Sequence, residues 1–262
     1  MARDLFDLTG KVVLATGANS GLGLGFLRGC AKKGADVVVW GRRADKNAEA
    51  VAALKALGAP RAHAEAVDVA DEAQVDAAMA ATLKAMGRVD CVFANAGIVS
   101  RAPHFADMTS EMYHGLLNVS LHGAFYTLRA ACRHMRDRAQ AGDPGGSLVI
   151  CGSLSIFYGL AGMEHYAAAK GALAAMMKGL AVEMGPYKVR ANMLAVGFIV
   201  TGLMDDHPDT EGVVRESAAI TPLGRVGELS DMEGPAVYLA SDASAWHSGD
   251  ILVLDGGRTV NG

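Results

Sequence analysis

Tyr166 and Lys170 are the two residues whose types and spacing point most directly to chemistry. Residues four apart share one face of a helix, so the lysine ammonium would lie beside the phenol. A free phenol, with a pKa of about 10, is too weak an acid for proton transfer near neutrality. A cation about 4 Å away at an effective dielectric of about 20 favours the phenolate by roughly 4 kcal/mol. The pair therefore predicts a group that gives a proton to an alkoxide and removes one from an alcohol.

Ser153 precedes the tyrosine by thirteen residues and follows an apolar run. Its hydroxyl could donate a hydrogen bond to the same substrate oxygen and stabilise the charge that develops there. Together, Ser153, Tyr166 and Lys170 predict a centre that exchanges a proton with a substrate oxygen and stabilises the charge on it.

A glycine-rich turn, TGANSGLG, follows the first apolar run of the chain. Gly17 would allow the tight turn, Gly21 the close approach of the backbone to a phosphate, and Gly23 the packing of a helix on the strand. Free amides at the start of that helix would then bind a pyrophosphate. The turn predicts a dinucleotide site.

Apolar runs and helical patterns alternate along the rest of the chain, as in sheets built from crossover connections. We expect an α/β fold with one doubly wound parallel sheet of the Rossmann type, about seven strands in a single domain over residues 1–262. The least regular stretch, about 197–227, is expected to form a substrate lid. The expected strands are 12–15, 36–40, 63–67, 89–94, 147–151, 189–195 and 251–254, and the expected helices include 44–57, 71–86, about 110–138, 164–183 and 231–240.

Six motifs in this order resemble the short-chain dehydrogenase/reductase family. Besides the glycine turn, Ser153 and the YxxxK pair, they are Asp68-Val69, Asn95-Ala96-Gly97 and Asp255-Gly256-Gly257. Each motif is common by itself, whereas six in the right order over nearly the whole chain are specific. The resemblance implies an NAD(P)-dependent carbonyl reductase or alcohol dehydrogenase, in which the lysine also holds the nicotinamide ribose.

The resemblance also implies the binding residues. For the cofactor these are Gly17, Asn19, Ser20, Gly21, Leu22, Gly23, Arg42, Asp68, Val69, Asn95, Ala96, Gly97, Tyr166, Lys170, Gly197, Ile199 and Thr201. For the substrate they are Leu154, Phe157, Met163, Val196, Phe198, Leu203 and Met204. We expect no arginine or lysine at the substrate end, and hence a neutral, mainly apolar ketone or secondary alcohol. His165 is expected to pack or to face solvent, since neighbours on a helix point apart.

Two further functions stay open from the sequence. An NAD-dependent dehydrogenase of sugars or polyols is favoured if the pocket proves polar. A regulator that senses nucleotide without chemistry is less favoured, because both Tyr166 and Lys170 are present.

The choice of cofactor depends on the end of the second strand. A carboxylate there would bind a ribose 2′-hydroxyl and repel a 2′-phosphate. This chain has Gly41 in that place, followed by Arg42 and Arg43, which favours NADP over the alternative, NAD. Ser20 argues the other way, because many NADP-preferring relatives have a basic residue there.

Two residues depart from the family pattern. Ser120 stands where relatives have a catalytic asparagine that holds a water beside the lysine, and we expect a retained but altered proton relay through its hydroxyl. Asn118 projects from another face of the helix and is a poor substitute. Val196 stands where relatives have a proline before a glycine, so we expect a reshaped wall beside the nicotinamide.

Composition and charge limit the partners. The net charge of −4 leaves no basic surplus for nucleic acid, and no apolar run or leader pattern suggests a membrane protein or a secreted one. We therefore expect a cytoplasmic protein acting on a small molecule, with no metal, as a homotetramer like its relatives. All four cysteines lie apart in apolar segments and are expected to be reduced packing residues: Cys30, Cys91, Cys132 and Cys151.

Overall fold

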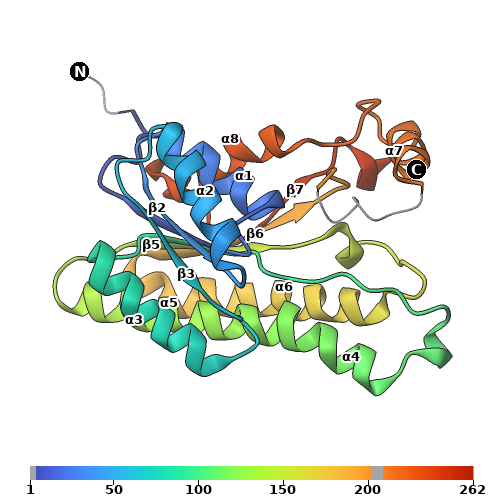
Figure 1. The fold of residues 1–262 in the computed structure, drawn as a ribbon, viewed down its shortest axis with the longest axis horizontal. Helices are drawn as coiled ribbons and strands as arrows, with labels where there is room; N and C mark the ends of the chain where they lie inside the picture. Colours follow the sequence, from blue (N-terminus) through green and yellow to red (C-terminus); the bar gives the residue numbers. More distant parts are fainter. Residues whose placement is uncertain (1–3, 202–208, 262) are drawn as a thin grey trace.

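The computed structural model describes residues 4–201 and 209–261. Seven parallel strands form one sheet in the order β3-β2-β1-β4-β5-β6-β7 (Figure 1). The direction of winding reverses between β1 and β4, which places a topological switch point at the middle of the sheet. The strands are β1 (Val12–Thr16), β2 (Asp36–Gly41), β3 (Ala62–Ala66), β4 (Cys91–Ala94), β5 (Gly146–Cys151), β6 (Val189–Val196) and β7 (Ile251–Leu254).

Helices cover both faces of the sheet (Figure 1). On one face lie α1 (Gly21–Lys32), α2 (Ala44–Ala56) and α8 (Glu233–Ala240). On the other lie α3 (Glu72–Met86), α4 (Ser110–Leu117), α5 (Gly123–Gln140) and α6 (Glu164–Met184). A further helix, α7 (Thr210–Ala219), lies at the end of the molecule where the strands finish.

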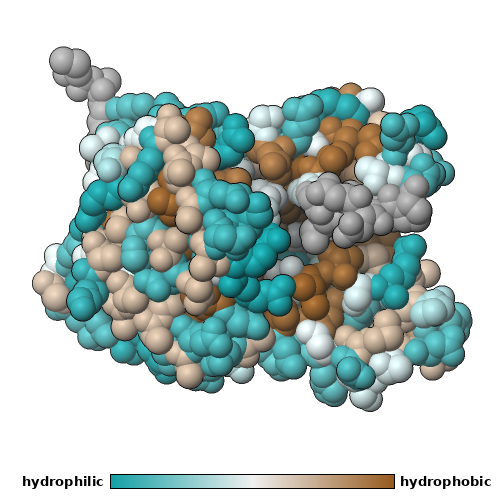
Figure 2. Space-filling model, in the orientation of Figure 1, coloured by the Kyte–Doolittle hydropathy of each residue, from teal (hydrophilic) through white to brown (hydrophobic). Residues whose placement is uncertain are grey.

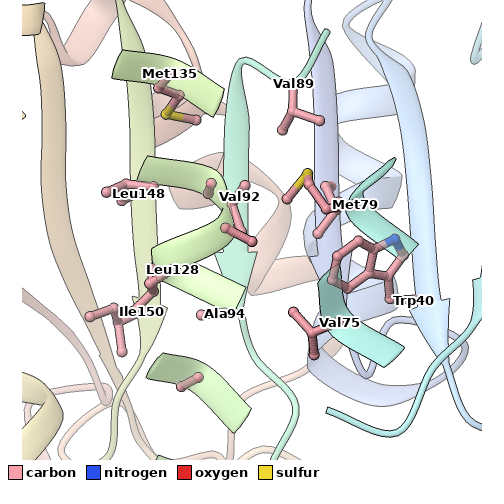
Figure 3. Packing of buried hydrophobic residues seen from close by; sticks show 14 of the residues in the cluster. Trp40, Val75, Met79, Val89, Val92, Ala94, Leu128, Met135, Leu148 and Ile150 are labelled. Atoms are coloured by element: carbon pink, nitrogen blue, oxygen red, sulfur yellow. The ribbon is translucent and has the colours of Figure 1, made fainter. Parts of the chain in front are cut away.

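The five inner strands are largely buried, whereas the edge strands β3 and β7 are partly exposed, and alternate residues of the inner strands feed two separate cores. In β1, Val12 and Leu14 pack into one core, and Val13 and Ala15 into the other. Figure 3 shows part of the first core, where Trp40 lies against residues of α3. The Trp40 indole donates a 3.0 Å hydrogen bond to the Thr82 hydroxyl, so its polar edge is satisfied without water.

All seven strands and the doubly wound topology are as the sequence predicts, with small shifts at the ends. The fourth strand begins at Cys91 rather than at residue 89. Just before it, the Asp90 carboxylate accepts a hydrogen bond from the backbone amide of Val12. The long helix begins with Thr109 as its cap, but a π-helical turn, Asn118–His122, interrupts it. The segment expected at 231–240 begins as a 3-10 turn, Leu229–Met232, before α8.

The stretch expected to be irregular contains a helix. Asp209 caps α7 by accepting a hydrogen bond from the Gly212 amide, which the sequence alone does not reveal because the helix is short and has a glycine in its first turn. Among the helices described, none is long and apolar enough to cross a membrane.

Candidate active site

A cleft of about 1680 Å³ lies beyond the carboxyl ends of the strands. Figure 2 shows hydrophobic groups around this hollow, on the side where β6 and β7 end in Figure 1. Its walls come from the segments after β1, β2, β4, β5 and β6, together with part of α7 and the C-terminal segment. The cleft therefore lies where ligands bind in open parallel sheets.

The glycine turn after β1 forms one end of the cleft. Gly17 and Gly21 have φ angles of 61° and 54°, which favour glycine. A Cβ on Gly23 would lie 2.7 Å from the Asn95 side-chain nitrogen, so this glycine packs the helix closely and does not line the cleft. Asn95 in turn donates to the Thr16 carbonyl at 2.9 Å and holds the turn in place. The amides at the start of α1 are thus directed to the cleft by a rigid backbone.

Asn47, which the sequence analysis missed, fixes the position of Asn19. Its side-chain oxygen accepts from the Asn19 amide at 2.8 Å, and its nitrogen donates to the carbonyls of Gly41 and Glu65, each at 2.9 Å. Asn47 is buried on α2, and a buried polar residue among alanines was the signal that could have identified it. A Cβ on Gly41 would lie 2.5 Å from the Asn19 nitrogen, so a carboxylate side chain has no room there while these amides stay.

The residues after β3 close the same end of the cleft. Asp68 and Val69 both line it, as expected. Asp68 accepts a hydrogen bond from the Ala70 amide and receives support from Gln74, which accepts from the Asp68 amide. A Cβ on Gly123, at the start of α5, would lie 2.6 Å from the Val69 side chain, so a glycine is needed for the helix to approach here.

Ser153, Tyr166 and Lys170 all line the middle of the cleft. The Lys170 amine is almost fully buried, donates to the Cys151 carbonyl at 2.7 Å and lies 5.7 Å from the centre of the Tyr166 ring. The Ser153 oxygen accepts from the Ser155 amide at 3.2 Å, which leaves its O–H free to donate to a ligand. The structure therefore places the three predicted groups in one cleft, and their catalytic roles stay a prediction.

Cys151 contributes its backbone and not its thiol to this centre. Burial raises the pKa of its thiol, an effect larger than the lowering by the Lys170 ammonium. The residue stays a neutral thiol and does not compete as a nucleophile. All four cysteines of the chain are free, as expected.

Ser120 lies behind the cleft rather than on its wall. It is fully buried within the π-helical turn, where its hydroxyl accepts from the Ile98 amide at 3.1 Å and donates to the Ile98 carbonyl at 3.3 Å. A Cβ on Gly97 would lie 3.4 Å from the Ser120 oxygen and 3.9 Å from the Lys170 nitrogen, so both groups flank this glycine. One lone pair of the hydroxyl is left for a water, and the altered relay stays a prediction. Asn118 is exposed and pairs with His122, so it points elsewhere, as expected.

Most of the remaining expected residues line the cleft. On the cofactor side these are Asn19, Ser20, Leu22, Arg42, Ala96, Gly97, Gly197, Ile199 and Thr201, and on the substrate side Leu154, Met163, Val196 and Phe198. Phe157 is half exposed and does not line it. Leu203 and Met204 lie outside the described residues. The lid over 197–227 stays a prediction.

The expectation that no cationic side chain faces the substrate end is wrong. Arg101, Arg225 and Arg258 all line the cleft. Arg101 follows β4 and Arg258 lies in the C-terminal segment, so neither belongs to a motif from which its position could be inferred.

His165 does not reach the cleft; it is buried, and its ring bonds to the Ser100 hydroxyl at 2.7 Å. In the part of the chain that the structure describes, no group of three or more potential ligands could hold a metal ion.

Comparison with known proteins gives consistent matches over nearly the full length. The family model described as enoyl-(acyl carrier protein) reductase matches residues 17–259. The chain is 36% identical to L-rhamnose 1-dehydrogenase (NAD(P)(+)) of Azotobacter vinelandii, with 97% of this chain and 98% of that protein covered. It is 33% identical to gluconate 5-dehydrogenase of Gluconobacter oxydans, with 98% of each covered.

Solved structures show the same fold. A short-chain type dehydrogenase/reductase from Mycobacterium marinum has a TM-score of 0.89 at 32% identity, with 98% of each chain covered. A gluconate 5-dehydrogenase from Burkholderia cenocepacia, in complex with NADP and tartrate, has a TM-score of 0.90 at 33% identity, again over 98% of each chain.

Replacing Ser120 by asparagine tests the altered relay. Ser120→Asn exchanges a hydroxyl tied to Ile98 for a longer amide with its own donors, so we expect kcat to change by about threefold or more, or its pH profile to move. Steady-state turnover against pH measures both. Asn118→Ser, in the same turn but pointing away, is the control. An unchanged rate and profile in Ser120→Asn would contradict the relay.

Removing the side chain of Asn47 tests how Asn19 is held. Asn47→Ala removes the side-chain hydrogen bonds to the carbonyls of Gly41 and Glu65 and frees the Asn19 amide, so the free energy of unfolding should fall by about 1–3 kcal/mol and cofactor affinity should weaken. Urea unfolding and fluorescence titration with NADP measure the two effects. Lys55→Gln, exposed on the same helix, is the control. An Asn47→Ala protein that binds the nucleotide as tightly as the wild type would show that this support has no role in binding.

Proposed function

The chain belongs to the short-chain dehydrogenase/reductase family, and we propose that it transfers a hydride between NADP(H) and the carbon of a small ketone or secondary alcohol. The observation that carries the proposal is the buried Lys170 amine beside Tyr166, in one cleft with Ser153 and the glycine turn. A proton donor and a nucleotide cradle in one cavity are what such a reaction requires.

The cofactor end of the cleft fits a dinucleotide. Gly21 has a positive φ, and a Cβ there would meet only Thr201 within 4 Å, so the backbone is open to a phosphate. The amides of α1 would hold the pyrophosphate, and Lys170 the ribose of the nicotinamide. When bound, the nicotinamide supplies or accepts the hydride.

The proton comes from this chain's own residues. In reduction, the Tyr166 hydroxyl gives its proton to the carbonyl oxygen as the hydride reaches the carbon. The substrate becomes an alcohol, and the Tyr166 side chain becomes a phenolate. The Lys170 ammonium stabilises that phenolate, and Ser153 donates a hydrogen bond to the same oxygen. Oxidation of an alcohol runs through the same groups in reverse.

NADP is the preferred nucleotide in this proposal. Asn19 and Asn47 occupy the space that a carboxylate at position 41 would need, and Arg42 and Arg43 line the cleft next to it. Guanidinium groups bind phosphate with two parallel hydrogen bonds. The solved gluconate 5-dehydrogenase holds NADP, which agrees with this preference, whereas the name of the rhamnose dehydrogenase relative covers both nucleotides.

Two substrate classes fit the cleft. The polar class, sugars and polyols, is favoured by the arginines at the substrate end and by the relatives named for rhamnose and gluconate. The apolar ketone is the second candidate, supported by Leu154, Met163, Val196 and Phe198 on the same wall.

The homotetramer stays a prediction; α6 leaves Val182 exposed on its outer face, where a second subunit could pack.

Changing Tyr166 to phenylalanine tests the chemistry. Tyr166→Phe removes only the hydroxyl, so kcat should fall by about 10²- to 10⁴-fold while the Kd of NADP stays within about threefold. Nicotinamide absorbance with a panel of polyols, hydroxy acids and ketones measures turnover. A variant that keeps more than about a tenth of the wild-type rate would refute the tyrosine as the proton donor.

Comparing the two nucleotides tests the cofactor. We expect NADP to bind at least about tenfold tighter than NAD, and Arg42→Gln to weaken NADP by about 10- to 100-fold while changing NAD little, since the lost bonds go to a charged group. Calorimetric titration gives both affinities. Tighter binding of NAD in the wild type would overturn the preference.

A further inference from the structure

The segment after β4, residues 97–102, runs along the cleft, and exposed residues alternate with less exposed ones along it. The exposed members, which all line the cleft, are Gly97, Val99 and Arg101. The less exposed members, each held by a hydrogen bond from another segment, are Ile98, Ser100 and Ala102. Ile98 lines the cleft as well, and the bonds to Ile98, Ser100 and Ala102 hold the backbone that carries Val99 and Arg101.

Two of these anchors come from the catalytic elements themselves. Ser120, in the π-helical turn, bonds to both backbone groups of Ile98. His165, which directly precedes Tyr166 on α6, bonds to the Ser100 hydroxyl at 2.7 Å and is 1% exposed. The segment is therefore held in register with the proposed proton donor.

The third anchor determines where Arg101 lies. The Ala102 amide donates to the Gly162 carbonyl at 2.9 Å, and a Cβ on Gly162 would lie 3.0 Å from the Cγ of Arg101. The arginine stem thus packs on a glycine four residues before Tyr166. Within residues 4–201 and 209–261, the Arg101 guanidinium has no hydrogen bond and no ion pair. Among the described residues this cation has no partner, and it is held against the cavity in which the chemistry is proposed.

A second guanidinium reaches the cleft from the C-terminal segment. Arg258 donates to the Ile220 carbonyl at 3.3 Å, and its guanidinium carbon lies 6.0 Å from the centre of the Tyr158 ring. Tyr158 follows Ser153 by five residues and also lines the cleft. Neither contact neutralises the charge of the arginine.

The two acidic residues that the structure describes at this end, Asp255 and Asp231, already have partners. Asp255 accepts from the Gly257 amide and from the amide and hydroxyl of Thr259; although burial acts to raise its pKa, these bonds hold the pKa below its usual value. Asp231 pairs with Arg225, whose hydrogen bonds lower the pKa of this carboxyl to about 2. Of the arginines that line this end among the described residues, Arg101 and Arg258 have no carboxylate partner.

We propose that Arg101 and Arg258 bind a carboxylate of the substrate, so that the site acts on an anionic secondary alcohol or ketone such as a hydroxy acid or an acidic sugar. This rests on the proposed hydride transfer and names the substrate class for it. Guanidinium groups suit a carboxylate because their geometry allows paired hydrogen bonds.

The test compares substrates that differ only in the charged group. D-Gluconate and D-glucitol have the same carbon chain with a carboxylate or a hydroxymethyl group at one end, and 3-hydroxybutyrate and 3-hydroxybutanamide form a second pair. We expect kcat/KM with NADP to favour the acid of at least one pair by about tenfold or more. Arg101→Gln should lower kcat/KM for that acid by about tenfold or more, mainly through KM, and for its neutral partner much less. Arg101→Lys should keep part of the preference.

A control and a binding measurement separate this inference from the proposed function. Arg136→Gln removes an exposed guanidinium outside the cleft and should leave the preference unchanged. Calorimetry with the NADP-loaded Tyr166→Phe protein should show gluconate binding that Arg101→Gln abolishes. Turnover of the neutral partners without any preference for acids would overturn the inference and leave the hydride transfer standing. Arginine-dependent gluconate binding without turnover of any compound would support the carboxylate site and contradict the hydride transfer. Absence of both gluconate binding and acid preference refutes the inference.

Discussion

The arrangement of the cleft depends on one buried charge, the ammonium of Lys170. An isolated cation is costly to bury, and here the Cys151 carbonyl accepts its hydrogen bond on one side while the Tyr166 ring lies on the other. Holding it there fixes how α6 crosses the end of β5, and with it the position of the tyrosine. Gly97 lies between the amine and the Ser120 hydroxyl, since a Cβ there would be in ordinary van der Waals contact with both.

The backbone segment after β4 links this centre to substrate selection. One set of its residues is bonded to Ser120 and His165, which belong to the helices that form the catalytic wall. The other set faces the cleft and includes Arg101. A rigid sheet supplies the frame, while selectivity comes from side chains on the loops beyond it, so related chains can keep the chemistry and change the substrate.

The elements with strong local signals were predictable. Buried strands read as short apolar runs, and the glycine turn and the Tyr166–Lys170 spacing are local patterns, so the sequence placed them correctly. Asn47 and Arg101 were missed because their positions depend on contacts with residues distant in the sequence, which no periodicity encodes. The helix α7 was missed because it is short and contains Gly212. The expectation of an apolar lining at the substrate end was incomplete because Arg258 reaches the cleft from the far end of the chain, a contact between residues distant in the sequence.

The central claim is that Tyr166 and Lys170 act as one proton-transferring unit, and a double-mutant cycle tests it most directly. The measurement is kcat at saturating NADP for Tyr166→Phe, Lys170→Met and the double variant. Residues that act as a unit are strongly non-additive, so the account predicts that the double variant is within about threefold of Tyr166→Phe alone. A double variant whose fold decrease in kcat equals the product of the fold decreases in the two single variants would contradict the account.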